Sequence, residues 1–443
     1  MEALLNAVDK HRRLILDAER YIWKHPETGY REIQTSKYME DQFEALGYEL
    51  VRAGDIPGFY TVLDTGRPGP EVLIFGELDS LICPSHPESD PNTGYVHACG
   101  HHAQCAALLG IAAALKEHGV CDSLCGRIRL CAVPAEELIE VGYRTELKEK
   151  GIIKYFGGKG EFLYRGYFDG VDMAFMVHTN KTFCSIKASV GCLIKTIHYK
   201  GLSAHAGASP WSGKNALYAA TQGLSAANAL RETFRESDII RFHPIITHGG
   251  EAVNAIPELV TVESYVRGSS FEAMKNASKK INQALCGGAL SVGGNIEIID
   301  KPGYAPLKND ENMLLLAKDA AALAIPEETF HVINDTSSGS TDMAELCGLM
   351  PVVHPYAGGS DGVDHGATYH IADPEKACVK SAKFQLGMLY LLLSDNAKRA
   401  NEIIAAFKPA FSSKEEYFAY LDTFYSEGDR ITYRDDGIAE IRL

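Results

Sequence analysis

Apolar residues in the first 180 positions change their spacing in a way that predicts alternating helices and strands. Helical spacing runs through 3–47, with a break at Pro26 to Gly29 and a second helix from Thr35 to about Leu46. Short apolar runs follow, separated by helix-like stretches. The runs lie at 72–75, 128–133 and 173–177, and the stretches lie at 106–118 and 147–155. Such runs are typical of strands buried on both faces, so we predict an α/β domain with a mostly parallel sheet and helices on both faces.

The pattern changes near residue 189. Polar and apolar residues alternate with a period of two over 191–201, which indicates a half-buried strand. Further predicted strands lie at 259–267 and 295–299, and predicted helices lie at 215–235 and 271–285. This stretch is predicted to form a smaller α+β satellite domain.

After the satellite stretch the α/β pattern resumes, with a helix at 311–324, a strand at 350–353 and a long helix at 375–393. We therefore predict a larger domain made of 1–188 and 304–395, a satellite domain of 189–303, and a C-terminal extension of 396–443. Aromatic residues recur through the extension, so we expect it to pack onto the body of the protein.

Composition narrows the classes of protein that this chain can represent. A length of 443 residues favours two domains over one. The net charge of −15 argues against a nucleic-acid partner, which would need an excess of Lys and Arg. We expect no membrane span and no signal peptide. The odd count of 11 cysteines fits reduced thiols in a cytoplasmic protein better than a disulfide framework.

Candidate chemistry gathers where the predicted strands end. Asp79 follows the first run, Glu136 and Glu137 follow the second, and His178 ends the third. Active sites of α/β sheets lie at the carboxyl ends of the strands. A segment rich in Cys and His, 97–102, lies between the first two runs, and its side chains are preferred ligands of zinc and similar metals.

Each of these residues also has an ordinary explanation. Adjacent carboxylates are common at the solvated N-terminus of a helix, and a histidine at a strand end is more often a core residue than a ligand. A chance combination of all four potential ligands, Cys99, His101, Glu137 and His178, at one sheet edge is much rarer than any one of them alone. Because Glu136 and Glu137 would repel each other without a cation, we expect one as a ligand and the other as an acid/base.

With these residues in place, the chain resembles the zinc aminoacylase and carboxypeptidase-like metallopeptidases over about 15–395. The resemblance is to their amidohydrolase branch, which includes hippurate, auxin-conjugate, aminobenzoyl-glutamate and β-alanyl-dipeptide hydrolases. It is carried by eight segments in order: His25–Tyr30, Gly76–Asp79, His97–His101, Pro134–Glu137, His178, Gly201–Ala206, Gly249–Pro257 and Gly339–Asp342.

The resemblance implies two divalent metal ions, zinc by default with manganese or cobalt as alternatives. Their ligands would be Cys99, His101, Glu137, His178 and a last histidine. His365 is favoured for that last place, His370 is the runner-up, and His354 is expected to line the pocket. Glu136 would be the general base, and Asp79 would hold a ligand histidine in place. His102 stands where many relatives carry Asp or Asn, and we do not expect it to be a ligand.

In similar proteins the satellite domain acts as a lid and forms a homodimer. The resemblance makes His205 a catalytic residue that polarises the scissile carbonyl, and it makes Asn254, Arg267 and Ser340 substrate-binding residues. Arg267 could pair bidentately with a substrate carboxylate. It is equally compatible with a structural role in its strand.

These observations predict a metal-dependent amidohydrolase that cleaves a small N-acyl amino acid or dipeptide, similar to aminobenzoyl-glutamate or a β-alanyl dipeptide. Its partner would be a small-molecule amide substrate, with no nucleic acid and no membrane. Two alternatives remain open. One is a non-catalytic metal-binding protein, and the other is a cysteine hydrolase that uses Cys99 as its nucleophile. The motifs leave the substrate and the metal undetermined.

Overall fold

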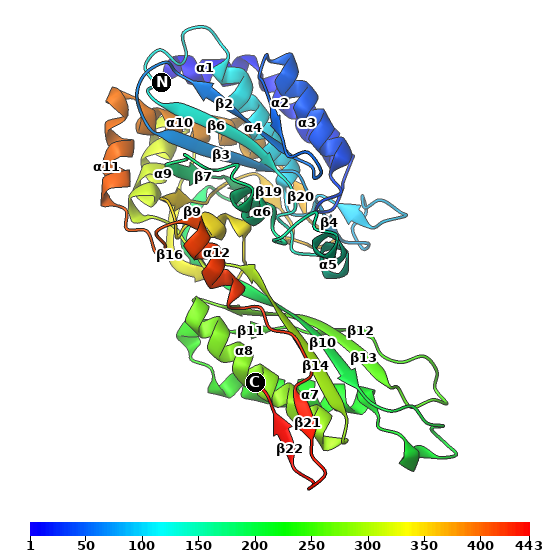
Figure 1. The fold of residues 1–443 in the computed structure, drawn as a ribbon. Coiled ribbons are helices and arrows are strands. Elements are labelled where there is room, and N and C mark those ends of the chain that lie inside the picture. Colours follow the sequence, from blue (N-terminus) through cyan, green and yellow to red (C-terminus); the bar gives the residue numbers. More distant parts are fainter. The chain divides into compact units, whose positions relative to one another are not determined.

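The structure is a computed structural model that describes residues 1–443. The chain folds into two compact units (Figure 1). Unit 1 consists of Met1–Ala188, Lys308–Asp335 and Thr341–Lys414, and unit 2 consists of Ser189–Leu307, Thr336–Ser340 and Glu415–Leu443. The segment 396–443 is thus divided between the two units at Lys414. No helix in the chain is both long enough and apolar enough to cross a bilayer. All eleven cysteines are free thiols.

Unit 1 is built on a six-stranded mixed sheet in which four neighbouring strands are parallel. The strand order is β1 (Val51–Arg52), β2 (Phe59–Asp64), β6 (Arg127–Val133), β3 (Glu71–Glu77), β7 (Met173–Phe175) and β17 (Val352–Val353). β6, β3, β7 and β17 are parallel, and β2 pairs antiparallel with β6. The predicted mostly parallel sheet is confirmed, and the antiparallel β1 and β2 are additions that the apolar runs did not reveal.

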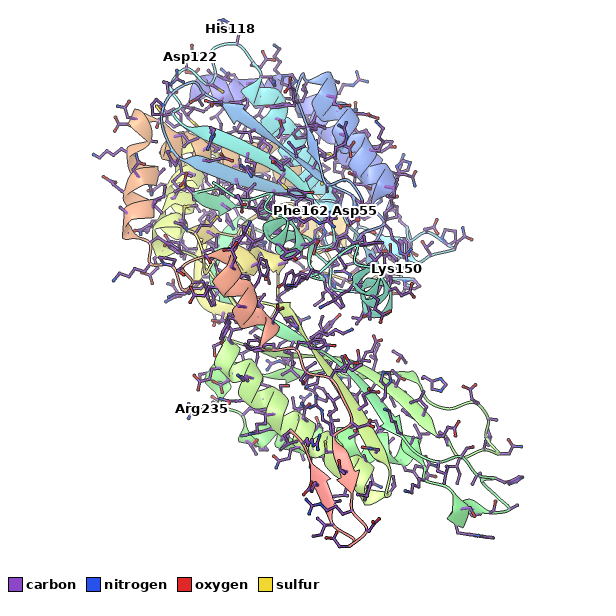
Figure 2. The ribbon with its side chains drawn as sticks, in the orientation of Figure 1. Asp55, His118, Asp122, Lys150, Phe162 and Arg235 are labelled. Carbon is purple, nitrogen blue, oxygen red and sulfur yellow. The ribbon has the colours of Figure 1, made fainter.

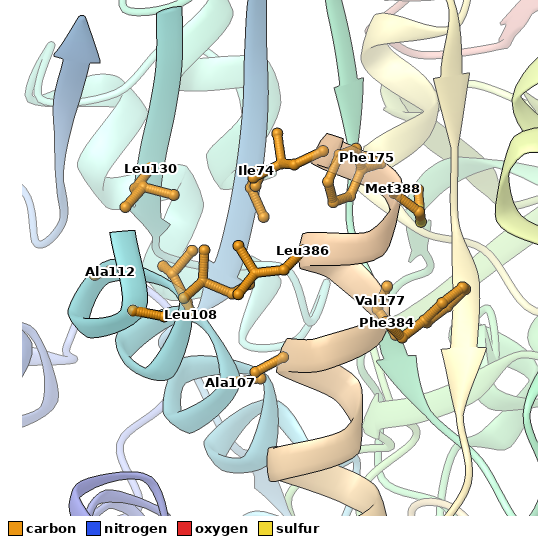
Figure 3. Packing of buried hydrophobic residues seen from close by; sticks show 14 of the residues in the cluster. Ile74, Ala107, Leu108, Ala112, Leu130, Phe175, Val177, Phe384, Leu386 and Met388 are labelled. Atoms are coloured by element: carbon orange, nitrogen blue, oxygen red, sulfur yellow. The ribbon is translucent and has the colours of Figure 1, made fainter. Parts of the chain in front are cut away.

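Both faces of this sheet are covered, as predicted. Ile74 of β3 belongs to the same core as Leu108 of α4 (His101–Leu115) and Leu386 of α10 (Ser381–Leu393) (Figure 3). The next residue, Phe75, points to the other face, where its ring lies 5.3 Å from that of Phe168. Phe162 of α6 (Gly158–Tyr164), labelled in Figure 2, has its ring 6.1 Å from that of Phe168 on that second face. Alternate residues of β3 are therefore buried on opposite sides, which explains its unbroken apolar run.

A smaller sheet in unit 1 carries two of the segments that surround the candidate site. Its strands are β15 (Leu307–Lys308), β9 (Cys184–Ser189), β18 (Pro355–Ala357) and β8 (His178–Thr179), with β16 (His331–Ser337) paired to β9. β18 and β8 are parallel, with Tyr356 opposite His178. Two short pairs complete the unit 1 strands: β4 (Leu81–Ile82) with β5 (Tyr95–Val96), and β19 (Ser360–Asp361) with β20 (His370–Ile371).

The remaining helices of unit 1 follow the predicted order with some corrections. They are α1 (Glu2–Lys10), α2 (Arg12–Trp23), α3 (Ile33–Ala45), α5 (Val141–Glu149), α9 (Glu311–Ala324), α11 (Lys398–Ala406) and the π-helical turn Glu375–Lys380 that leads into α10. The prediction of a helix at 147–155 is wrong. The helix α5 begins earlier, at Val141, and ends before Gly151, whose φ of +71° lies outside the helical region. The first expected helix is divided at His11.

Unit 2 is an antiparallel sheet covered by two helices. Its strand order is β11 (Arg241–Phe242), β13 (Leu259–Gly268), β10 (Gly191–Lys200) and β14 (Asn295–Tyr304), with β12 (Ile245–His248) also paired to β13. The helices are α7 (Ala216–Ala229) and α8 (Phe271–Ser291). The period of two predicted for β10 is confirmed, because Leu193, Ile197 and Tyr199 all point into the core beneath these helices.

The C-terminal residues of the chain complete unit 2. The helix α12 (Lys414–Asp422) leads into the hairpin β21 (Ile431–Tyr433) and β22 (Ala439–Ile441). Phe424 and Ile431 belong to the core of unit 2, so this part of the extension is packed against the unit.

Candidate metal centre and active site

The turn before α4 strongly favours glycine at position 100. Gly100 has a φ of +97° and caps the N-terminus of α4. A β-carbon at this position would overlap the hydroxyl oxygens of Thr179 and Tyr369. This close approach holds the flanking Cys99 and His101 against β8, the strand that carries His178.

Cys99, His101 and His178 converge on one point. The Sγ atom of Cys99 lies 3.3 Å from Nε2 of His178, and the rings of His101 and His178 lie 5.6 Å apart. One ligand atom from each of the three residues lies within 4.8 Å of the other two. The structure therefore brings Cys99 and His101 to His178, which lies 79 positions after Cys99 in the sequence. The motifs led us to expect this convergence.

Asp79 contacts both the histidine His101 and the loop that carries Glu137. Its Oδ1 lies 3.1 Å from Nδ1 of His101, and its Oδ2 accepts a 2.7 Å hydrogen bond from the backbone N–H of Glu137. The engagement of Nδ1 directs Nε2 of His101 toward the centre of the site. Asp79 thus lies behind the histidine, where the resemblance placed it, and it also orients the loop that carries Glu137.

A strained loop after β6 presents Glu136 and Glu137. Ala135 has a φ of +58°, an unfavourable conformation for a residue with a β-carbon. Its N–H donates a 2.8 Å hydrogen bond to Glu32 Oε1. The guanidinium of Arg144, which is fully buried, donates to the carbonyls of Ala135, Glu137 and Phe156. Glu32 and Arg144 were not identified from the sequence, because they act on the backbone and leave no motif.

His365 lies in the cluster, whereas His370, the runner-up for the last ligand, lies outside it. Its Nε2 is 3.1 Å from Oε1 of Glu137, and Cys99, Glu137 and His365 form a second group whose ligand atoms lie within 4.8 Å of one another. His365 has a φ of +60°, another strained position. His370 is exposed in β20, and its Nδ1 lies 3.0 Å from the carbonyl of Thr368. His354 is buried 5.8 Å from the ring of His178.

The two adjacent glutamates have different electrostatic surroundings. Burial, followed by the charges of Glu77 and Glu137, raises the pKa of Glu136 well above its usual value. Burial also opposes ionisation of Glu137, but the nearby His365 outweighs it and lowers the pKa of Glu137 to about 2. A carboxylate of lowered pKa beside one of raised pKa suits the division between ligand and acid/base.

The donor set fits a pair of divalent ions. The two groups above share Cys99, and a third group of Glu77, His101 and Glu136 shares His101. Thiolate, imidazole and carboxylate together suit zinc and related metals. His101 Nε2 is fully buried and has no hydrogen-bond partner, which is costly for a polar atom unless a cation binds it. The donor atoms of Cys99, His101, Glu137, His178 and His365 thus lie in two overlapping groups, and those of Glu77 and Glu136 join them through His101.

Lys159, at the start of α6, is a further buried charge that the sequence analysis missed. Its Nζ contacts Glu77 Oε1 at 2.5 Å and also Asp342 Oδ1, and all three side chains are fully buried. Gly158 lets the helix approach the loop closely, because a β-carbon there would overlap the carbonyl of Pro134. Asp342 lies in a segment with a recognised motif, but nothing in the sequence connects it with a lysine 183 positions away.

The other expected residues lie in unit 2. His205 is exposed, and its Nδ1 accepts hydrogen bonds from the N–H groups of Gly207 (3.1 Å) and Ala208 (3.0 Å). Because Nδ1 is an acceptor, the proton of the neutral ring is on Nε2. Asn254 is next to His205: its carbonyl accepts a hydrogen bond from Ala206, and Ala255 forms a β-bridge with His205.

Arg267 and Ser340 are brought together in unit 2 although they are 73 positions apart. Arg267 donates a 2.7 Å hydrogen bond from Nη1 to Oγ of Ser340 and a 3.2 Å hydrogen bond from Nε to Nε2 of His243. The guanidinium is half-buried and lacks a carboxylate partner in unit 2.

The chain is similar to known hydrolases over most of its length. The model of Peptidase family M20/M25/M40 matches residues 73–390. The Xaa-Arg dipeptidase of Mus musculus is 26% identical over 401 residues, covering 88% of this chain and 85% of the relative. A polypeptide of the p-aminobenzoyl-glutamate hydrolase of Escherichia coli is 27% identical over 333 residues, covering 70% of this chain and 63% of the relative.

Among solved structures, a dinuclear metal-binding peptidase of Bacillus subtilis from the M20 family has the same fold. Its TM-score is 0.62 at 21% identity, and the match covers 86% of this chain and 98% of that one.

Proposed function

Since the chain belongs to Peptidase family M20/M25/M40 and is thus a hydrolase of amide or peptide bonds, we propose that it cleaves small N-acyl amino acids or dipeptides with two bound divalent ions. The observation that carries this proposal is Glu136, a buried carboxylate of raised pKa at the edge of the converging ligand groups. Similarity to a dinuclear metal-binding peptidase supports the number of ions.

We assign the ions to Cys99, His101, Glu137, His178 and His365. Divalent ions in such a site would act as Lewis acids and lower the pKa of a water molecule to about 7. Zinc is the first candidate because thiolate and imidazole donors dominate, and manganese or cobalt would also accept the carboxylate. Asp79 contacts both His101 and the backbone of Glu137 and so orients these two ligands for this role.

Glu136 is the proposed general base and acid. It removes a proton from the attacking water and later transfers it to the nitrogen of the leaving amine. Its raised pKa suits both steps, because a carboxyl of ordinary acidity would hold the proton too weakly to return it. The Arg144 contacts with the loop carbonyls fix the direction in which Glu136 is presented.

His205 is the proposed donor to the oxyanion that forms when water adds to the carbonyl. The two backbone hydrogen bonds to Nδ1 leave Nε2–H as an exposed donor of fixed direction. Donors of this kind contribute about 3 kcal/mol to lowering the barrier.

The substrate class rests on Arg267 and on the relatives. A half-buried guanidinium with a serine hydroxyl beside it suits the carboxylate of an amino-acid product. The names of the relatives refer to a dipeptide ending in arginine and to an acylated glutamate, both of which carry such a carboxylate. Asn254 is proposed as a further substrate contact.

A homodimer through unit 2 is also proposed. Large apolar side chains are exposed on several of its segments, among them Trp211 (82% exposed), Tyr218, Ile245 and Val253. Tyr218 and Val253 line one hollow, and Ile245 lies in β12, which pairs with β13. Exposed apolar groups beside a free strand edge are typical of interfaces between protein chains. The cytoplasmic location stays a prediction.

One observation favours a second mechanism. Cys99 Sγ lies 3.3 Å from His178 Nε2, and although burial opposes it, the nearby histidines lower the pKa of Cys99 to about 6. A thiolate beside an imidazole is the arrangement of cysteine hydrolases. A chelator separates the mechanisms, because a thiol nucleophile would work without metal.

The proposed function is tested with Glu136→Gln, assayed with the wild-type enzyme on a panel of N-acyl amino acids and dipeptides. We expect the variant to keep its bound metal and to lose a factor of roughly 10²–10⁴ in kcat. Glu140→Gln is the matched control, since Glu140 accepts a hydrogen bond from Thr28 at 2.5 Å outside the site and should leave turnover unchanged. Wild-type turnover by Glu136→Gln, or activity that survives chelation, would contradict the proposal.

A further inference from the structure

We propose that Glu77 is an additional ligand of the metal centre, supplying its Oε2 atom to the ion that His101 binds, and that Lys159 and Asp342 hold it in that position. The inference rests on the proposed function, because it adds a residue to the same centre. It starts from the third group of potential ligands, Glu77, His101 and Glu136, of which the sequence analysis assigned a role to the last two only.

The position of Glu77 is set by the sheet. It is the last residue of β3 and lies two residues before Asp79, so it is at the carboxyl end of the central parallel strands. Its side chain is fully buried. The strand backbone and the burial together leave the carboxylate little freedom to move.

The charges of Glu77 and its two buried neighbours Lys159 and Asp342 do not balance among themselves. Lys159 is the one cation of a buried trio, and Glu77 and Asp342 are its two anions. Asp342 is bound twice, because its Oδ2 also accepts a 2.8 Å hydrogen bond from the backbone N–H of Lys159. The trio therefore carries one net negative charge in a site without solvent, and a buried charge of this kind requires a partner of opposite sign.

The two oxygens of Glu77 have different surroundings. Oε1 contacts Lys159 Nζ at 2.5 Å, whereas Oε2 has no hydrogen-bond partner. Oε2 lies 3.2 Å from Nε2 of His101, and this nitrogen also has no hydrogen-bond partner. Asp79 engages the other ring nitrogen, Nδ1, and so directs Nε2 toward Glu77 and the metal centre. The excess negative charge of the trio is thus directed at the nitrogen that faces the metal centre.

The separation of these two atoms suits a shared ion. Zinc binds nitrogen and oxygen at about 2.0–2.2 Å in tetrahedral geometry, which places two ligands of one ion roughly 3.3–3.6 Å apart. The Oε2 to Nε2 distance of 3.2 Å is close to this range. Glu136 Oε2 is 3.9 Å from the same nitrogen and is less well placed to share the ion.

A simpler role for Glu77 is to pair only with Lys159 and with a protonated His101. In that case Glu77 would stabilise the protein equally with and without metal. As a ligand, it would instead stabilise the metal-bound protein more. The comparison of the two states therefore decides between these roles, and it does not depend on measuring activity.

The test uses the full-length protein with Glu77→Gln, and Glu71→Gln is its matched control. Glu71 is a buried carboxylate at the other end of β3 that pairs with Arg129 (2.5 Å) and Arg127 (2.8 Å), far from the metal ligands along the strand. Glu77→Gln leaves Lys159 paired with Asp342 as a neutral couple, so we expect the variant to fold. Metal content after dialysis against Zn²⁺ and the rise in Tm on adding Zn²⁺ are the two readouts.

We expect Glu77→Gln to bind zinc at least 10-fold more weakly at one of two sites and to show a smaller rise in Tm on adding Zn²⁺. Glu71→Gln should bind zinc as the wild type does. Glu77→Asp provides a second test should the amide variant fail to fold, since it keeps the charge but withdraws the oxygen by about 1.5 Å. Wild-type zinc affinity in whichever of the two Glu77 variants folds would overturn the inference. Failure of the wild-type protein itself to bind zinc, manganese or cobalt would instead refute the proposed function.

Discussion

The backbone conformation of Gly100 positions Cys99 and His101, two of the proposed metal ligands. A methyl group there would strain the left-handed backbone and would also overlap Thr179 and Tyr369. Gly47, which follows α3, has a φ of +79° but open space around it. We predict that Gly47→Ala lowers the free energy of unfolding by about 1 kcal/mol, the effect of backbone strain alone. Gly100→Ala should lower it by roughly 2–5 kcal/mol.

Urea titration measures the free energy of unfolding, and metal analysis of the same samples shows whether the turn still binds zinc. We expect Gly100→Ala to lose zinc and Gly47→Ala to retain it. Equal stability losses and full metal content in both variants would show that the overlap at Gly100 is relieved by small movements.

Residues within contiguous motifs could be predicted from the sequence, whereas residues joined only by folding could not. Cys99, His101, Glu137 and His178 converge as expected, and the structure places His365 beside Glu137 while His370 is exposed. Their roles as ligands stay predictions. Lys159 was missed because its partners are 82 and 183 positions away. No periodicity or motif reports a pairing of that kind.

Elements with a strong period were predicted well, and short or glycine-rich ones were not. The helix expected at 311–324 has those bounds in α9, and the period of two in β10 is confirmed. The sequence of α6, in contrast, has two glycines in seven residues and is too short for a helical period to be recognised. Since α6 carries Lys159, an error about one element concealed a residue of the site.

A buried lysine in the antiparallel sheet of unit 2 forms an ion pair within the sheet and hydrogen bonds to helix α8. Lys195 of β10 is fully buried, and its Nζ contacts Asp300 Oδ1 (2.5 Å), Asn282 Oδ1 (2.6 Å) and Ser278 Oγ (2.8 Å). We predict that Lys195→Met lowers the free energy of unfolding by roughly 3–5 kcal/mol, because it leaves Asp300 as a buried anion without its lysine.

The control is Lys200→Met in the same strand. Lys200 forms exposed contacts with Asp429 (2.8 Å) and Glu297 (3.0 Å), and such pairs contribute about 0–1 kcal/mol. Both variants are measured by urea denaturation. A loss from Lys195→Met that is no larger than the loss from Lys200→Met would show that the buried pair adds little.

For the whole molecule, the fold class was predictable because it depends on the order of apolar runs. An α/β body interrupted by an α+β stretch follows from the change of period near residue 189, and both sheets are present. The small sheet that carries His178 was not predicted. β8 and β18 are two and three residues long, and they pair over a separation of 178 positions. Pairing at that distance depends on the finished fold and leaves no local pattern.

The proposed homodimer is the prediction that concerns the whole molecule. A lysine at Trp211 or Val253 would place a charge within the apolar surface of unit 2, where both side chains are now almost fully exposed. We expect the wild-type protein to be a dimer at micromolar concentration, and Trp211→Lys with Val253→Lys to make it a monomer, because a buried charge without a partner opposes association. Light scattering coupled to size-exclusion chromatography gives the mass directly, against a chain mass of 48.3 kDa. Leu315→Lys, at an exposed apolar position of α9 in unit 1, should leave the dimer intact. A monomeric wild type, or a double variant that stays dimeric, would show that these exposed residues do not form the interface.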